Sequence, residues 1–347
     1  MTLKNKEEYK NLEELKSTKT VLSTEEHDAI SKTGTGTVSK SVRTRLPIVI
    51  LTAIFCCTLW GSASPAIKIG YELFDIAAGD TPSRILFAGN RFVIAGIMVI
   101  IFGSILQKKI LIPKKESIKY ILVLACFQTI IQYIFFYMAL AFTSGVRGSI
   151  INAAGSFFSI LLAVYAFRFE KLSIRKAAGM IIGFAGVFLC VTGGSSSFLE
   201  GGFSIQGEGA MLLAAFASAV AGCFIKLFSQ KENPVILSGY QFFLGGIVMS
   251  IIGKLLGGHL IIVSSGSIPL LIYMAFISAG AYTLWGVLLK YNPVSTVTVL
   301  GFVNPVMGVI LSAIFLHEGA EALSIYTLIA LVLVSLGIYI INRKSAR

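Results

Sequence analysis

The feature that most constrains this chain is a series of apolar stretches that follow one another almost without interruption after residue 45. A helix needs roughly 20 apolar residues to cross the hydrocarbon core of a bilayer. Ten stretches meet this requirement, at residues 46–70, 84–106, 118–141, 143–166, 173–193, 207–229, 234–256, 267–290, 293–316 and 323–341. The sequence therefore predicts an all-α integral membrane protein with ten transmembrane helices.

The charge composition agrees with this fold. Only 13% of the residues are charged, whereas a soluble domain carries about 25%. The net charge of +12 does not indicate a nucleic-acid partner, because the basic residues lie mainly in short connections between apolar stretches. We expect the partners to be the lipid bilayer and a small-molecule substrate, and the protein to be a monomer or a homodimer.

Lysine and arginine residues predict the orientation. If the N-terminus is cytoplasmic, the inner segments hold the tail lysines and Lys108, Lys109, Lys114, Lys115, Lys119, Arg168, Lys171, Arg175, Lys176, Lys231, Lys290, Arg343, Lys344 and Arg347. Cytoplasmic loops are enriched in these residues, and an even number of spans places both termini on one side. We expect an inner (plasma) membrane protein of a bacterium with both termini cytoplasmic. Residues 1–45 are polar and predict a disordered tail rather than a cleavable signal peptide.

The two halves of the chain resemble each other. The matched segments are Ile67-Lys68 with Ile225-Lys226, Gly89-Asn90-Arg91-Phe92 with Gly239-Tyr240-Gln241-Phe242, Glu170 with Glu318, and Gly186 with Gly337. Each half, 46–193 and 207–342, is thus a unit of five helices, and because five is odd the second unit must be inverted. Inverted repeats are typical of secondary transporters, whose substrate site lies at the repeat interface. The alternative is a duplication that only packs a bundle.

Three motifs resemble a known family. They are Trp60-Gly61-Ser62-Ala63-Ser64-Pro65-Ala66-Ile67-Lys68, Ala88-Gly89-Asn90-Arg91-Phe92-Val93-Ile94-Ala95-Gly96, and Asn304-Pro305-Val306 followed by Glu318. Together they resemble the EamA family of the drug/metabolite transporter superfamily over residues 46–342. The resemblance implies a central cavity lined mainly by spans 1, 3, 4, 6, 8 and 9, and export of amino acids, related metabolites or drugs. Phe157 stands where the first repeat of the family often has a proline, so a kink there is uncertain.

Polar and aromatic side chains recur at helical spacing inside several spans. These candidate substrate-binding residues are Trp60, Ser64, Lys68, Arg91, Gln128, Gln132, Tyr137, Ser149, Asn152, Ser156, Tyr282, Trp285 and Asn304. Polar groups within a membrane usually face the bundle interior. The stripe Ser149, Asn152, Ser156 and Ser159 in the fourth span is the strongest candidate. The alternatives are hydrogen bonds between helices for the polar residues and packing for the aromatic residues.

Three cations, Lys68, Arg91 and Arg147, are predicted in the outer half of the membrane. They could form a positive vestibule that favours carboxylates, or Lys68 and Arg147 could extend to the headgroups while Arg91 pairs with the acidic first outer loop. Pro65 and Pro305 are candidate hinges, with a static kink as the alternative.

Glu318, which ends the ninth span, is a candidate for proton coupling. No Asp or Glu lies in the middle of a predicted span. This distribution argues against an exchanger built around a central membrane carboxylate.

These features favour a secondary transporter (permease) that exports amino acids or related small polar metabolites by alternating access. A non-transporting membrane sensor or scaffold and a multidrug exporter of the same superfamily remain as alternatives. An enzyme is not expected, because the three histidines, His27, His259 and His317, lie apart and outside the spans. The sequence lacks the Gly-x-x-x-x-Gly-Lys-Ser/Thr loop of primary pumps. We expect no cofactor and no metal.

Overall fold

The computed structural model describes residues 46–169, 171–192, 203–292 and 299–342. The predictions for the tail 1–45, for Glu170 and for Arg343, Lys344 and Arg347 fall outside the described residues, as does the side chain of Lys290. From residue 50 onward, the described residues belong to one compact unit, Ile50–Arg347.

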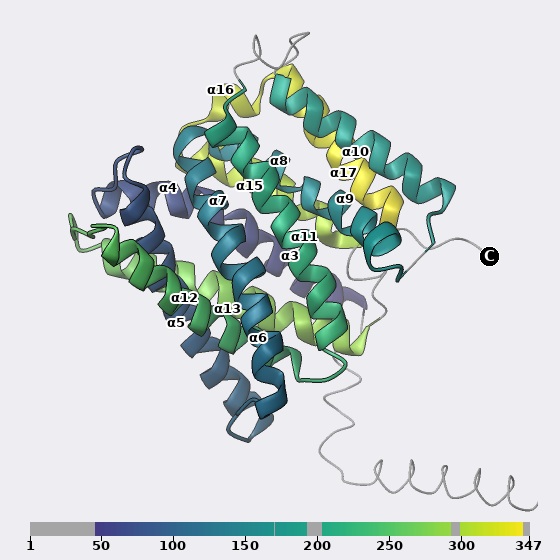
Figure 1. Ribbon diagram of the computed structural model, residues 1–347. Coiled ribbons are helices and arrows are strands. Elements are labelled where there is room, and N and C mark those ends of the chain that lie inside the picture. The colour runs from purple at the N-terminus through teal and green to yellow at the C-terminus, as the bar shows by residue number, and fades with distance from the viewer. Residues whose placement is uncertain (1–45, 170, 193–202, 293–298, 343–347) are drawn as a thin grey trace, which may run out of the picture. The chain divides into compact units, whose positions relative to one another are not determined.

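The described part of the first half contains five helical spans (Figure 1). The first consists of α3 (Leu46–Gly61) and α4 (Ala63–Leu73), and the second is α5 (Thr81–Gln107). The third runs through the 3-10 turn η1 (Lys115–Ser117), α6 (Ile118–Leu124), the π-helix η2 (Ala125–Ile131) and α7 (Gln132–Phe142). The fourth consists of α8 (Gly145–Asn152), α9 (Ala154–Leu161) and the π-helix η3 (Leu162–Ala166), and the fifth is α10 (Ile174–Thr192).

The second half repeats this order. The π-helix η4 (Ile205–Gly209) and α11 (Ala210–Phe228) form the sixth span, α12 (Pro234–Leu255) the seventh and α13 (Ser267–Tyr291) the eighth. The 3-10 turn η5 (Val299–Phe302) leads into α15 (Val303–Phe315), and the short α16 (Gly319–Ala322) precedes α17 (Ile325–Asn342). Within the described residues, nine helices are long and apolar enough to cross a membrane, and Leu300–Phe315 is a shorter apolar helix. The predicted membrane fold is confirmed.

Two pairs of helices at the same position in the two halves make the most extensive contacts. The second and seventh spans, α5 and α12, make the most extensive helix contact, followed by the fifth and tenth, α10 and α17, which lie side by side in Figure 1. At the first contact Gly89 meets Gly246 and Gly96 meets Gly239. Gly89 and Gly239 are matched in sequence. Gly89 contacts the residue seven positions after Gly239, and Gly239 contacts the residue seven positions after Gly89, so the contact is reciprocal. A twofold relation between the repeats requires this pattern.

The contact between α10 and α17 depends on glycine in the same way. A Cβ atom added to Gly337 would lie 2.7 Å from the carbonyl oxygen of Gly179 and 2.8 Å from the Cα of Gly183. The motif Gly179-x-x-x-Gly183 therefore packs within the chain. Small residues at this spacing let two helix backbones approach closely in a membrane.

Two spans are interrupted where a proline follows. Pro65 has no N–H to donate to the carbonyl of Gly61, and the first span divides at Ser62. Pro305 likewise cannot donate to Gly301, and the ninth span changes there from the 3-10 turn η5 to α15.

The fourth span divides at Ala153, although Phe157 replaces the expected proline. The backbone N–H groups of Ala153 and Ser156 bond to carbonyls three residues back, at 3.2 and 3.1 Å. The discontinuity that the sequence left uncertain is therefore present, but it comes from a local tightening of the helix rather than from proline.

Candidate functional site

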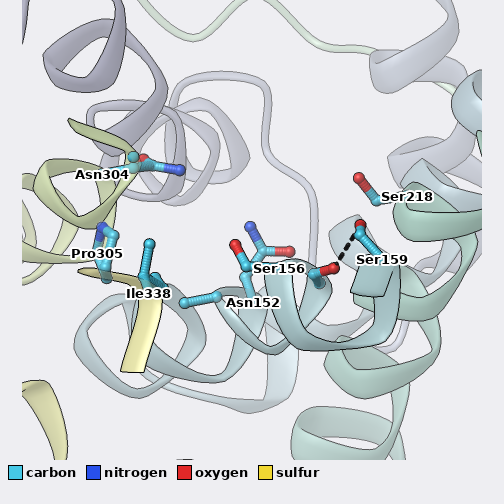
Figure 2. Close-up of a pocket in the computed structure, with 10 residues that line it drawn as sticks. Asn152, Ser156, Ser159, Ser218, Asn304, Pro305 and Ile338 are labelled. Carbon is cyan, nitrogen blue, oxygen red and sulfur yellow. Dashed lines mark hydrogen bonds between the residues drawn. The ribbon is translucent and has the colours of Figure 1, made fainter. Parts of the chain in front are cut away.

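A polar cavity lies where the interrupted fourth and ninth spans meet (Figure 2). One part, of about 220 Å³, is lined by Asn152, Ala153, Gly155, Ser156, Ser159, Ser218, Gly301, Asn304, Pro305 and Ile338. The adjoining part, of about 340 Å³, shares five of these residues and adds Cys57, Trp60, Ile160, Trp285 and Asn342. The two parts form one cavity with walls from the first, fourth, sixth, eighth, ninth and tenth spans.

The cavity is lined by equivalent positions of the two repeats. Trp60 and Ser218 each lie eight residues before a matched lysine, Lys68 or Lys226. Ser156 and Asn304 each lie fourteen residues before a matched glutamate, Glu170 or Glu318. Trp60, Ser218, Ser156 and Asn304 all line the cavity. It therefore lies at the interface between the repeats, where inverted-repeat carriers place their substrate.

The two parts of the cavity differ in chemistry. The ring centroids of Trp60 and Trp285 are 5.1 Å apart at an interplanar angle of 61°, and Tyr282 packs on Trp60 at 5.6 Å. The other part presents the amides of Asn152 and Asn304 together with serine hydroxyls. None of the described lining residues carries a formal charge. The cavity thus combines aromatic rings in one part with hydrogen-bonding groups in both parts.

Of the four polar residues predicted to share one face of the fourth span, three line the cavity and one does not. Asn152, Ser156 and Ser159 line the cavity, but the Oγ of Ser149 donates to the carbonyl of Gly145 at 2.7 Å and lies 3.4 Å from the Oγ of Ser64. A Cβ added to Gly308 would lie 2.5 Å from Ser149 Oγ. Ser149 and Ser64 therefore occupy a helix contact, which is the alternative that the sequence left open.

Tyr282, Gln128 and Gln132 are absent from the cavity lining, although Tyr282 packs on Trp60. The Nε2 of Gln128 donates to the hydroxyl of Tyr282 at 3.3 Å. Both Gln128 and Gln132 are buried, and among the described residues their Oε1 atoms accept no hydrogen bond. The π-helix η2 just before Gln132 changes the helical register that the sequence spacing assumed. None of these three residues is in the cavity lining.

Arg91 is a structural hub rather than a cavity residue. Its side chain is 1% exposed and donates to the carbonyl of Met274 (3.0 Å), the hydroxyl of Tyr137 (2.9 Å) and the Oγ of Ser278 (3.0 Å). Three donor atoms of one guanidinium thus join α5, α7 and α13. The expectation that Arg91 pairs with the acidic outer loop is wrong, because its partners are neutral groups of neighbouring helices.

Glu318 belongs to a second group of polar residues. This group lies near the C-terminal end of α15, whereas the cavity lies at the N-terminal end of the same helix. The Glu318 carboxylate accepts the N–H groups of Gly145 (3.0 Å) and Val146 (2.8 Å) and lies 3.4 Å from Lys68 Nζ. Lys68 also donates to the carbonyl of Thr143 at 2.8 Å. A carboxylate at the N-terminus of α8 satisfies backbone donors and the helix dipole. Glu318 appears without a basic neighbour in the sequence, but the fold supplies Lys68.

Arg147 makes a parallel connection to the sixth span. Its Nη1 lies 3.4 Å from the Oε1 of Glu208, and its Nη2 donates to the carbonyl of Val191 at 2.7 Å. Glu208 is 1% exposed and also accepts hydrogen bonds from the side chain of Thr143 and the backbone of Ser204. Sequence reasoning missed Glu208, although a lone carboxylate at the start of an apolar span was the available signal.

The predicted positive vestibule is therefore a mistaken interpretation. Lys68 is paired with Glu318, Arg147 with Glu208, and Arg91 with neutral buried groups. Each cation already has partners within the fold, and none lines the cavity.

Comparison with known proteins agrees with this architecture. The model of the EamA-like transporter family matches residues 47–192 and 205–343. An uncharacterized transporter of Archaeoglobus fulgidus is 30% identical over 295 residues, which cover 83% of this chain and 96% of that protein. A protein of Escherichia coli named a probable amino-acid metabolite efflux pump is 25% identical over 301 residues, 83% of this chain and 92% of its own.

A solved crystal structure has the same fold, with a TM-score of 0.56, 19% identity, and coverage of 85% of this chain and 95% of that one. The two family matches, one in each half, correspond to the two five-helix units whose glycine-lined contacts are reciprocal. The chain belongs to the EamA-like transporter family and is a multi-pass membrane protein of that family.

Proposed function

We propose that this protein is a secondary transporter that exports a small polar metabolite, an amino acid or a related compound, across a bacterial inner membrane by alternating access. The observation that carries the proposal is the polar cavity lined by equivalent positions of two repeats. The name of the Escherichia coli relative supports the substrate class and the direction. We take 46–193 and 207–342 as the two repeats, with 1–45 as a cytoplasmic tail.

Alternating access follows from the repeat relation. Two similar units in opposite orientation can exchange conformations, and the exchange opens one cavity first to one side and then to the other. Trp60 with Ser218 and Ser156 with Asn304 occupy equivalent positions, so both units contribute to the surface that the solute meets. Pro65 and Pro305, at the interruptions of two lining spans, are the proposed hinges.

We propose that the ionic cluster, formed by the pairs Lys68–Glu318 and Arg147–Glu208, closes one end of the transport pathway. Asn304 lies in the first turn of α15, and Glu318 lies just after its last turn. A helix of 13 residues is about 20 Å long, so the cluster and the cavity lie at opposite ends of α15. The cavity extends instead to Asn342, the last residue of α17. With cytoplasmic termini, the cluster would seal the outer side.

Glu318 is the proposed point of proton coupling. Its carboxylate holds Lys68 and the N-terminus of α8 together. A proton on that carboxylate would remove the charge that attracts Lys68 and would weaken both backbone hydrogen bonds. This loosening would favour opening at the sealed end.

Flux in proteoliposomes tests the proposal. The full chain is reconstituted, and uptake of radiolabelled amino acids, sugars and organic acids is compared with uptake by an Asn152→Ala Ser156→Ala variant. Ser149→Ala is the matched control, because Ser149 belongs to the same span but lies in a helix contact outside the cavity. We expect saturable uptake that the double variant loses and the control keeps. Failure of every solute to cross faster than in empty liposomes, with and without a proton gradient, would refute transport.

A further inference from the structure

We infer that the protein binds the headgroup of an anionic phospholipid at a site formed by Lys119, Tyr120 and Lys231. The partner is a lipid whose phosphodiester carries a net negative charge, such as phosphatidylglycerol, rather than a zwitterionic lipid such as phosphatidylcholine. None of the three residues lines the cavity. Binding at this site therefore does not depend on the proposed transport.

The site lies on two connections that pack against each other, one between α5 and η1 and the other between α11 and α12. The Nδ2 of Asn233 donates to the Oε1 of Gln107 at 2.9 Å. The backbone N–H of Lys114 donates to the Oε2 of Glu232 at 3.1 Å. These hydrogen bonds join a connection of the first repeat to one of the second, so the side chains that the two connections carry are held on one surface.

This surface is strongly basic. Its exposed lysines are Lys108, Lys109, Lys114, Lys115, Lys119 and Lys231. Of its carboxylates, Glu232 is buried and already accepts two backbone N–H groups, and Glu116 is exposed. Neither Lys119 nor Lys231 forms an ion pair with a described residue, whereas Lys68 and Arg147 in the ionic cluster each do. Basic residues next to a membrane attract anionic lipids, and these two lysines keep their charge available.

The two lysines share one aromatic ring. The Nζ of Lys119 lies 5.3 Å from the centroid of the Tyr120 ring, and the Nζ of Lys231 lies 5.4 Å from it. Lys231 also donates to the Tyr120 hydroxyl at 3.3 Å. The Tyr120 ring in turn packs on Phe228, with centroids 4.6 Å apart. Two ammonium groups held at one ring repel each other, and a phosphate that contacts both would turn this repulsion into attraction.

An exposed apolar surface continues from Lys119 along the third span. Leu122 is 55% exposed and Ile118 is 46% exposed. Residues three or four positions apart are neighbours on a helix surface, so Lys119, Leu122 and Cys126 follow one line along the helix. A headgroup at Lys119 would place its acyl chains beside Leu122. A cationic contact followed by an apolar one matches a phospholipid better than a soluble phosphate.

Cys126 supplies a probe next to the site. All five cysteines lie in the described residues, and Cys126 alone is exposed. It lies seven residues after Lys119, about 10 Å along the helix, where the acyl chains of a bound lipid would pass. A fluorophore is attached to Cys126 of the full chain in phosphatidylcholine vesicles. Its quenching by phosphatidylglycerol with brominated chains is then compared with its quenching by phosphatidylcholine with brominated chains.

We expect phosphatidylglycerol to associate about tenfold more strongly than phosphatidylcholine, because each lysine near the anionic headgroup contributes roughly fivefold. In the Lys119→Gln Lys231→Gln variant the ratio should fall to about twofold. Lys108→Gln Lys109→Gln is the matched control, since it removes the same charge from the same surface and leaves the Tyr120 site intact. That control should keep the parent ratio, as should Lys119→Arg Lys231→Arg. If the first double variant fails to fold, each single variant replaces it and should give an intermediate ratio.

Three results would overturn the site. A parent ratio near one would show that the surface does not recognise anionic lipid. An equal fall in the two glutamine double variants would show diffuse attraction by the whole basic surface. Loss of the preference when inorganic phosphate replaces chloride at the same ionic strength would assign the lysine pair to soluble phosphate rather than to a lipid.

Discussion

The two ends of the α8–α15 contact use polar residues in opposite ways. At one end, Glu318 and Arg147 make ion pairs and hydrogen bonds to backbone groups that join five spans, the first, fourth, fifth, sixth and ninth. At the other end, Asn152 and Asn304 line an open cavity in which no described residue is charged. Charges held together resist separation, whereas uncharged dipoles around a space can exchange partners. The difference is that Lys68, Arg147, Glu208 and Glu318 form contacts between helices, whereas the residues that line the cavity are uncharged among those described.

The largest expected effect is the loss of the cation from the pair of Arg147 and Glu208, in which the Glu208 side chain is 2% exposed and that of Arg147 is 21% exposed. Arg147→Ala leaves the buried carboxylate of Glu208 without its cation, and because breaking a fully buried pair costs about 3–5 kcal/mol, we expect a cost toward the lower end of that range. We expect a large fall in thermal stability in detergent. Adding Glu208→Gln to the Arg147→Ala variant should recover part of the loss, because the uncompensated charge is removed. A double variant no more stable than the single one would show that the pair is not the cause.

The pair of Lys68 and Glu318 should give a smaller effect on stability and a larger one on conformation. The side chains are 25% and 15% exposed, so we expect Lys68→Ala to cost about 1–2 kcal/mol, less than a fully buried pair. According to the proposed closure of one end by this contact, the variant should also increase labelling of a cysteine placed at Ser149, measured against the same cysteine with Lys68 intact. Unchanged labelling would mean that the cluster stabilises the fold without closing a pathway.

For a residue that lines the cavity, we expect a substitution to change transport and to have little effect on stability. Asn304→Ala removes one hydrogen-bonding group, and a single hydrogen bond contributes roughly 0.5–1.5 kcal/mol. The apparent affinity in flux assays should fall by about fivefold, while the thermal stability stays within about 0.5 kcal/mol of the parent. Ser149→Ala should leave the affinity unchanged. A stability loss in Asn304→Ala as large as that in Arg147→Ala would erase the distinction between the two ends.

The smallest effect concerns Glu232, a carboxylate in the connection between α11 and α12. Burial raises the pKa of this carboxyl, but a larger opposite effect comes from hydrogen bonds with the N–H groups of Asn233 (2.8 Å) and Lys114 (3.1 Å), a hydrogen bond with the Ser117 side chain and the charge of Lys114, so that the pKa lies below the usual value. A lowered folded pKa contributes stability above the unfolded pKa of about 4.5, and this contribution is lost as the pH falls through the folded value.

The measurement is thermal stability at pH 7 and at pH 4 or below for the parent and for Glu232→Gln. The parent should be more stable than the variant at pH 7, and the two should converge toward acid. Parallel curves would indicate that these hydrogen bonds and the charge of Lys114 do not stabilise the charged form.

The fold was largely predictable because a bilayer makes strict demands on a sequence. Stretches such as 84–106 and 234–256 are too apolar and too long for anything but a membrane helix. The repeat could be read from Gly89 and Gly239, whose reciprocal packing the structure shows. The cavity was predictable in part: helical spacing identified Asn152 and Ser156, since residues three or four positions apart share one face.

Interruptions of the helices limited the remaining predictions. Spacing placed Ser149 on the same face as Asn152, but the structure gives Ser149 to the contact with α15. The π-helix η2 altered the register near Gln132. A change in the backbone hydrogen-bond pattern leaves little trace in a periodicity that assumes an ideal helix.

The sequence by itself determined that the chain spans a membrane as two related five-helix units, because apolar length and duplicated motifs are local properties of a chain. Only the tertiary structure decided which polar residues line the cavity and which lie in helix contacts. Lys68 and Glu318 stand 250 positions apart, and their pairing depends on how the two units dock. A sequence does not show whether a charged side chain is paired, because its partner can belong to a distant segment. Here the carboxylates that pair with Lys68 and Arg147 come from other spans.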